Sequence, residues 1–175
     1  MYNEAKLLGL KPPVFLRLAS YENTNQAVID QDSARIKKTL QEISPSILFL
    51  PYQKDCHPRH HLATAMTLQA LKTIDMPITL FFYETPWHTF GPFDFNASFV
   101  FDAPIMAKKL EAIHVHASQL KRSAFDCAAQ CLAQFRACMV PEQRMYGYGN
   151  NHDRDTVERA GFMEVFLRKT IRKRT

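Results

Sequence analysis

A continuously apolar segment, a histidine-rich loop and an amphipathic segment follow one another in the first half of the chain. The segment 47–51 is apolar without alternation, as in a strand that is covered on both faces. The loop Asp55–His61 contains three histidines and one aspartate, and residues 62–74 carry apolar side chains at helical spacing. This order predicts that the loop lies outside the carboxyl end of a buried parallel strand, where α/β proteins bind their ligands.

The spacing of the histidines predicts how the loop joins the following helix. Pro58 is expected to occupy the first helical position, which suits its fixed φ angle and its missing N–H. His57 then lies at the cap, and His60 or His61 shares a helix face with it. A neutral imidazole there can bind zinc or titrate near neutral pH. Two interpretations stay open: the histidines belong to a metal or catalytic site, or they only cap and decorate the start of a helix.

Strand-like and helix-like segments alternate along the chain, which predicts an α/β fold with a mostly parallel sheet. We expect the strands at 14–18, 47–50, 78–83 and 98–101. A polar loop is predicted at 23–30 and a turn at 145–151. The helices are expected at 2–10, from Asp32 or Ser33 to Ile43, at 58–74, from Asp102 or Ala103 to Leu120, at 125–139, and at 157–171 as a helix or a helix followed by a strand.

The composition is that of an ordinary globular protein. The chain has 175 residues, 46% of them hydrophobic and 22% charged, which suits a single domain spanning residues 1–175. No apolar run reaches the length of a membrane span, and no signal peptide opens the chain, so we expect a cytoplasmic protein with no membrane partner.

The cysteines and the basic residues have local explanations. The last three of the four cysteines, Cys127, Cys131 and Cys138, share one helical stripe, which favours buried free thiols over a metal or disulfide role. The net charge of +5 comes from the basic end at 168–174. A solvated terminus explains it better than a nucleic-acid groove does, because no aromatic residues interleave with the basic ones there.

Five segments together resemble one family. Asp55-x-His57-Pro58-x-His60 resembles the second motif, roughly Asp-x-His-Pro-Asp-His, of the PIG-L/LmbE family of zinc-dependent N-acetylglucosaminide deacetylases. The other similar segments occur in the family's order and cover nearly the whole chain: Asn3–Gly9, Leu80–Glu84, Lys108–Ile113 with His116–Gln119, and Gly161–Phe166. The resemblance implies a Rossmann-like three-layer sandwich and a metal-dependent hydrolase that deacetylates an N-acetylglucosamine-type sugar conjugate.

Two departures from the family pattern limit what the resemblance implies. The family's first motif, His-Pro-Asp-Asp-Glu, which supplies two metal ligands and the general base, has no counterpart here. Arg59 replaces the usual aspartate and sets a cation beside His60. The expected deacetylase domain therefore lacks its first strand and helix, and its zinc is expected to be weak or absent unless the missing ligands are supplied. The sequence is expected to be a fragment, to start upstream of Met1, or to be completed by an N-terminal segment of a partner chain; a homo-oligomer is also compatible with it.

The resemblance assigns roles to individual residues. It implies His60 as the metal ligand, His57 as the polarising or protonating group, and Asp55 as the residue that orients the loop or a histidine. Arg59 is expected to bind a substrate phosphate, and His116, which matches a family histidine, to reach the substrate unless it is a surface residue. Glu84 follows the strand 78–83 and is expected either to orient a histidine, to bind a sugar hydroxyl, or to be solvated.

Two questions about function stay open at this point. The aromatic loop 85–95 is expected to stack on sugar rings, or else to pack against its own domain or a second subunit. The alternative function is a non-catalytic sugar-binding or assembly domain that kept the fold and lost the metal.

Overall fold

A computed structural model describes residues 2–91, 94–145, 156 and 159–172, with the side chains of 140–145 outside the description. The chain divides into two compact units. Unit 1 comprises residues 1–14 and 92–165, and unit 2 comprises residues 15–91 and 166–175. The strand β4 (Phe162–Ile171) runs from the first unit into the second. The division was not expected, because the sequence shows no interdomain linker.

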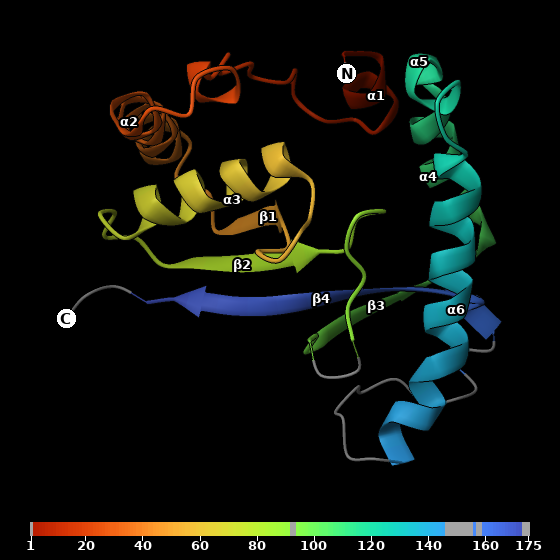
Figure 1. Cartoon of the computed structure of the whole chain (residues 1–175). Coiled ribbons are helices and arrows are strands. Elements are labelled where there is room, and N and C mark those ends of the chain that lie inside the picture. The colour runs from red at the N-terminus through yellow and green to blue at the C-terminus, as the bar shows by residue number, and fades with distance from the viewer. Residues whose placement is uncertain (1, 92–93, 146–155, 157–158, 173–175) are drawn as a thin grey trace. The chain divides into compact units, whose positions relative to one another are not determined.

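Unit 2 contains the apolar segment 47–51 and the histidine-rich loop Asp55–His61. Its elements are the 3₁₀ helix η1 (Ala19–Tyr21), α2 (Gln26–Ile43), β1 (Ile47–Pro51), α3 (Pro58–Leu71), β2 (Ile78–Tyr83) and the second part of β4. The helix α3 begins at Pro58 with His57 as its cap residue, as predicted. Figure 1 shows α3 lying along β1 and β2, with α2 beyond it.

The sheet is mixed rather than mostly parallel. Its strand order is β1-β2-β4-β3, where β3 is Ala97–Phe101. β1 pairs with β2 in parallel, whereas β2 pairs with β4 antiparallel. Tyr83, at the end of β2, is opposite Pro51 on one side and Phe166 on the other. The prediction of a mostly parallel sheet is wrong because it placed a helix, or a helix followed by a strand, at residues 157–171, where the long strand β4 pairs antiparallel with β2.

The core of unit 2 lies between α3 and the sheet. Met66 and Phe82 are fully buried, and Ile78 and Leu80 are nearly so. β1 is less covered than its apolar sequence predicts: Ile47 is 51% exposed and Phe49 is 54% exposed. The ring of Phe49 stacks on that of Phe81 with centroids 5.4 Å apart. The expectation that β1 is covered on both faces is therefore wrong.

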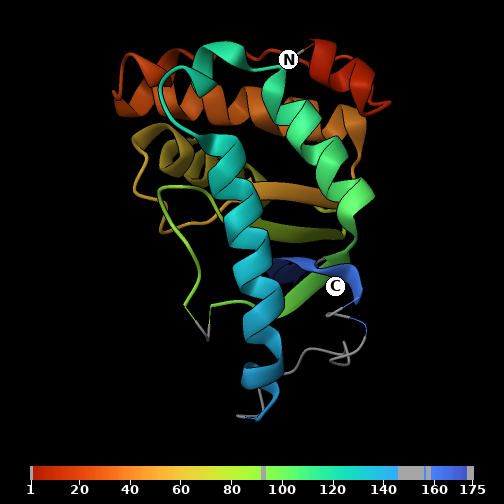
Figure 2. The same ribbon diagram turned by 90° about the vertical axis from the view of Figure 1, so that its right-hand side faces the viewer.

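Unit 1 is mainly helical. Its elements are α1 (Tyr2–Leu7), β3, α4 (Ala103–His114), α5 (Ala117–Leu120), α6 (Phe125–Met145) and the first part of β4. Figure 2 shows α4 and α6 running next to each other, and α1 contacts α4. Met106 of α4 and Met163 and Val165 of β4 are buried. No helix among the described residues has the length and apolar character needed to cross a membrane.

Several predicted element boundaries are wrong. Residues 14–18 form no strand. The helix α2 begins at Gln26 inside the predicted polar loop, because the side chain of Asn25 accepts a hydrogen bond from Ala27 N and caps it there. The predicted helix 103–120 is interrupted between α4 and α5, and α6 continues past Pro141. The predicted turn at 145–151 lies outside the described residues apart from Met145, which ends α6.

The cysteine stripe is wrong in one respect and right in another. All four cysteines are free, as expected. The three cysteines of the stripe are exposed rather than buried, because the stripe does not lie on the buried face of α6, where Ala133, Arg136 and Ala137 are found.

Candidate functional site

Backbone hydrogen bonds that involve no histidine fix the first part of the loop between β1 and α3. Tyr52 N donates to Tyr83 O at 3.2 Å, which extends the parallel pairing by one residue. Asp55 N then donates to Tyr52 O at 3.0 Å and turns the chain towards α3. The loop therefore places the side chain of Asp55 between the start of α3 and the segment that follows β2.

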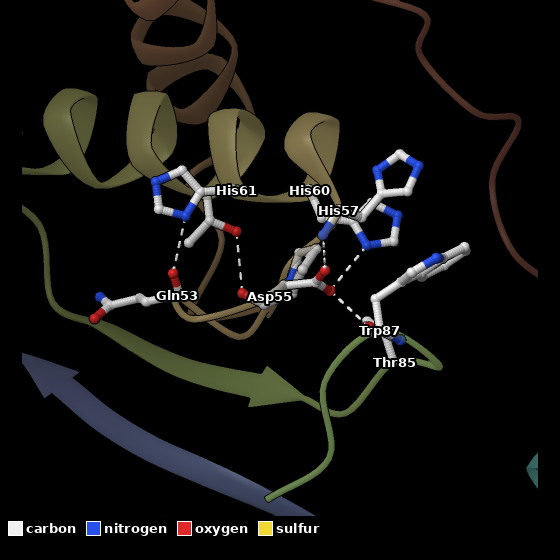
Figure 3. Close-up of polar contacts among 9 residues, drawn as sticks. Gln53, Asp55, His57, His60, His61, Thr85 and Trp87 are labelled. Carbon is white, nitrogen blue, oxygen red and sulfur yellow. Dashed lines mark hydrogen bonds and ion pairs between the residues drawn. The ribbon is translucent and has the colours of Figure 1, made fainter.

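Asp55 is the centre of the polar contacts drawn in Figure 3. Its Oδ1 accepts a hydrogen bond from His57 N at 2.7 Å. Its Oδ2 accepts a hydrogen bond from the Thr85 hydroxyl at 2.6 Å and lies 2.9 Å from Nδ1 of His60. One buried carboxylate thus connects the loop, the first turn of α3 and the residue two positions past β2.

The charge of Asp55 follows from these contacts. Burial raises the pKa of Asp55, but the hydrogen bonds from Thr85, the His57 backbone and His60 outweigh it and hold that pKa below its ordinary value. Asp55 is therefore ionised at neutral pH. Asp55 in turn adds to burial in raising the pKa of Tyr83.

The ionised carboxylate determines the tautomer of His60. Nδ1 of His60 faces an acceptor, so it carries the proton, and in the neutral ring Nε2 then carries the lone pair. The side chain of His60 is 30% exposed. An imidazole oriented in this way by a carboxylate is suited to accept a proton or to bind a metal through Nε2.

Three rings gather beside this contact. The ring centroids of His57 and His60 are 4.5 Å apart, and those of His57 and Trp87 are 4.7 Å apart. Trp87 is 43% exposed, so an apolar surface stands next to the two imidazoles. Nδ1 of His57 is buried and has no hydrogen-bond partner among the described residues. A buried polar atom without a partner costs about 1–3 kcal/mol, a cost that a bound polar group would relieve.

Thr85 positions Trp87 as well as Asp55. The backbone of Thr85 exchanges two hydrogen bonds with that of His88, each 3.1 Å long, which closes a tight turn. Trp87 N donates to the Thr85 hydroxyl at 3.2 Å within this turn. Sequence reasoning included Trp87 in the aromatic loop but missed Thr85. Its position directly after Glu84, at the end of a buried strand, was the available signal.

Arg59 and Glu84 lie near this cluster in sequence but have other contacts. Arg59 is exposed on α3, and its guanidinium lies 5.8 Å from the ring centroid of Tyr21. The carboxylate of Glu84 accepts a hydrogen bond from Phe90 N at 2.6 Å and so supports the aromatic loop. Pro92 and Phe93 of that loop lie outside the described residues.

His116 belongs to unit 1, whereas the other predicted site residues belong to unit 2. It lies at the break between α4 and α5, as the cap residue of α5. Its Nε2 is 2.8 Å from the carboxylate of Glu4 in α1. His116 therefore joins three helices of unit 1.

The described residues do not supply a complete zinc site. Catalytic zinc takes three protein ligands. No group of three histidine, cysteine, aspartate or glutamate side chains in the described part of the chain is placed to hold a metal. His60 has the carboxylate partner that metal-binding histidines commonly have, but it is a single ligand.

Comparison with known proteins adds no identification. No model of a known protein family matches the chain, and no curated protein matches it significantly.

Proposed function

We propose that this chain provides the proton-transfer and substrate-stacking groups of a hydrolase that removes the acetyl group from an N-acetylglucosamine-type sugar conjugate. The proposal includes a Rossmann-like three-layer fold and a location in the cytoplasm. The observation that carries it is the 2.9 Å contact between the buried Asp55 carboxylate and Nδ1 of His60. Amide hydrolysis needs a group that takes a proton from water and a group that protonates the leaving amine.

The two imidazoles can divide these tasks. Nε2 of His60 takes the proton from the water that attacks the acetyl carbonyl, while Asp55 holds the ring and stabilises its charged form. His57, 4.5 Å from His60 between ring centroids, gives a proton to the leaving nitrogen. The C–N bond then breaks to give acetic acid and the free amine, and the acid releases its proton to solvent as acetate. The proton held by His60 passes to His57, which restores both rings.

The neighbouring residues suit a sugar. The exposed face of Trp87 offers an apolar surface for the C–H face of a pyranose ring. The exposed guanidinium of Arg59 can pair with a phosphate on the substrate. Glu84 has a supporting role in the proposal, because its carboxylate accepts a hydrogen bond from Phe90 N and so holds the aromatic loop. His116 is left out of the proposal because its ring is engaged with Glu4.

Deacetylation assays with N-acetylglucosamine conjugates test the proposal. We expect His60→Ala and His57→Ala each to lower kcat by about 10²–10⁴-fold, the usual contribution of acid–base catalysis. His61→Ala is the matched control, because His61 lies in the same turn of α3 and its Nδ1 is bonded to the Gln53 carbonyl instead. Equal activity of the wild type and His60→Ala contradicts the proposed mechanism.

The affinity of the protein for zinc is a separate prediction. Since the described residues offer one oriented imidazole, we expect zinc to bind the protein weakly or substoichiometrically. Metal analysis after dialysis measures this directly. Tight binding of one zinc ion per chain contradicts the expectation and would require ligands beyond those described.

A non-catalytic sugar-binding or assembly domain is the second candidate. It is favoured by the exposed Trp87 ring and by the lack of a three-ligand group among the described residues. Calorimetry separates the two functions: sugar binding that Trp87→Ala abolishes, without turnover of the acetyl conjugate, supports the second candidate. Light scattering on the same samples measures assembly. Ile47 and Phe49 on the edge strand β1 are exposed apolar residues through which chains could associate.

A further inference from the structure

Two exposed thiols lie next to each other on α6, in the unit that does not contain the histidine cluster. Cys127 and Cys131 are one helical turn apart, and their Sγ atoms are 3.9 Å from each other. Both cysteines are free and face solvent. The proposed function uses neither of them.

The helix prevents this pair from closing a disulfide easily. Side chains four residues apart on a helix have Cβ atoms about 5–6 Å apart. A disulfide needs Cβ atoms about 3.5–4.5 Å apart. A disulfide between Cys127 and Cys131 would therefore distort α6. With their Sγ atoms 3.9 Å apart, the two thiols are close enough for one ion to contact both.

The immediate surroundings also favour the protonated form of Cys127. The hydrogen bond with Cys131 raises the pKa of Cys127, and the charge of Asp126 acts in the same direction. A thiol whose pKa is raised is a weak nucleophile at neutral pH. A metal ion that binds thiolate strongly can still displace the proton of such a thiol.

We propose that Cys127 and Cys131 form a two-coordinate site for a soft monovalent cation, Cu(I). Thiolates select Cu(I) over the harder ions that carboxylates and carbonyls prefer. Two sulfurs on one face of a helix suit an ion that is satisfied by two ligands. In the binding step one Cu(I) gains two Cu–S bonds, two S–H bonds break, and two protons go to solvent; no atom changes its oxidation state.

The other two cysteines provide matched controls. Cys138 lies on α6 seven residues beyond Cys131, about 10.5 Å along the helix axis, which is too far for one ion to bridge. Cys56 is exposed but belongs to unit 2. Serine is close to cysteine in size, and all four cysteines are exposed, so each substitution should leave the fold unchanged. Circular dichroism checks that each variant is folded.

The test is an anaerobic titration of the untagged, reduced full chain with Cu(I) in the presence of the chromogenic chelator bicinchoninate. We expect one Cu(I) per chain to be withdrawn from the chelator by the wild type, Cys56→Ser and Cys138→Ser. Cys127→Ser and Cys131→Ser should each lose this binding completely. The site is disproved if either of these two variants keeps its bound Cu(I), if a control variant loses it, or if the wild type withdraws none.

Discussion

At the scale of single residues, Asp55 has the largest number of defined tasks. Its carboxylate accepts hydrogen bonds from His57 N, which fixes the loop, and from the Thr85 hydroxyl. The same carboxylate orients the ring of His60 through Nδ1. Hydrogen bonds to a charged group contribute more than neutral ones, about 1.5–3 kcal/mol each. A residue proposed to act in catalysis therefore also stabilises the local fold, and the two effects have to be separated by experiment.

We expect Asp55→Asn to lower the free energy of unfolding by about 1.5–3 kcal/mol at neutral pH. Because the pKa of folded Asp55 lies below the unfolded value of about 3.9, its carboxylate stabilises the fold above that pH, and this contribution is lost as the pH falls through the folded pKa. Urea unfolding at about pH 7 and about pH 3 should therefore show a difference between wild type and variant that shrinks in acid.

Glu22→Gln is the control for this comparison, since Glu22 is an exposed carboxylate just after η1. It should change stability little at either pH. A difference between wild type and Asp55→Asn that grows in acid would show that Asp55 is not ionised in the folded protein.

At the scale of the elements, the start of α2 is set by a capping side chain and not by the apolar periodicity of the helix. The apolar spacing of Ile36, Leu40 and Ile43 in α2 predicts one buried side, but only Ile36 and Leu40 are buried, and Ile43 is 61% exposed. The helix also begins ten residues before Ile36. Asn25 accounts for the extra turns because its side chain accepts from Ala27 N at 2.9 Å. At α3 the cap residue His57 makes no such side-chain bond, and its ring stays available to the site.

Removal of the α2 cap has a calculable effect. We expect Asn25→Ala to destabilise the protein by about 0.5–2 kcal/mol, because Ala27 N loses its acceptor. Thermal unfolding followed by circular dichroism measures the change. Gln31→Ala, in the exposed interior of α2, should leave the midpoint unchanged or raise it. Equal midpoints for the wild type and Asn25→Ala would mean that α2 starts nearer to Asp32, as the sequence suggested.

At the scale of the whole molecule, the chain divides into two compact units, and each contains buried side chains. Met66 is fully buried in unit 2, and Met106 is 2% exposed in unit 1. The chain contains one tryptophan, Trp87, which lies in unit 2 and serves as a fluorescence probe in that unit. The two methionines therefore provide matched substitutions, one in each unit.

We expect Met66→Ala to lower the urea midpoint of the Trp87 transition by an amount equivalent to about 2–5 kcal/mol. Met106→Ala should shift the circular dichroism transition to lower urea and the fluorescence transition much less, because its cavity forms in the other unit. Identical shifts of both signals for Met106→Ala would show that the chain unfolds as a single cooperative unit.

Local chemistry by itself determined much of the histidine segment. Apolar runs defined β1 and β2, and Pro58 set the start of α3. These features depend on neighbouring residues, whose steric and hydrogen-bonding preferences can be read from spacing. The sequence also brought Asp55, His57 and His60 together, because all three lie within one turn of the same helix start.

Only the tertiary structure decided the contacts between distant positions. The bond from Thr85 to Asp55 joins residues 30 apart in the chain, and the pairing of β4 with β2 makes the sheet mixed. The exposure of Phe49 and of the cysteines on α6 likewise depends on which face each element turns to its neighbours. Periodicity identifies a stripe of residues but not the partner that covers it, since burial is a property of packed pairs of elements.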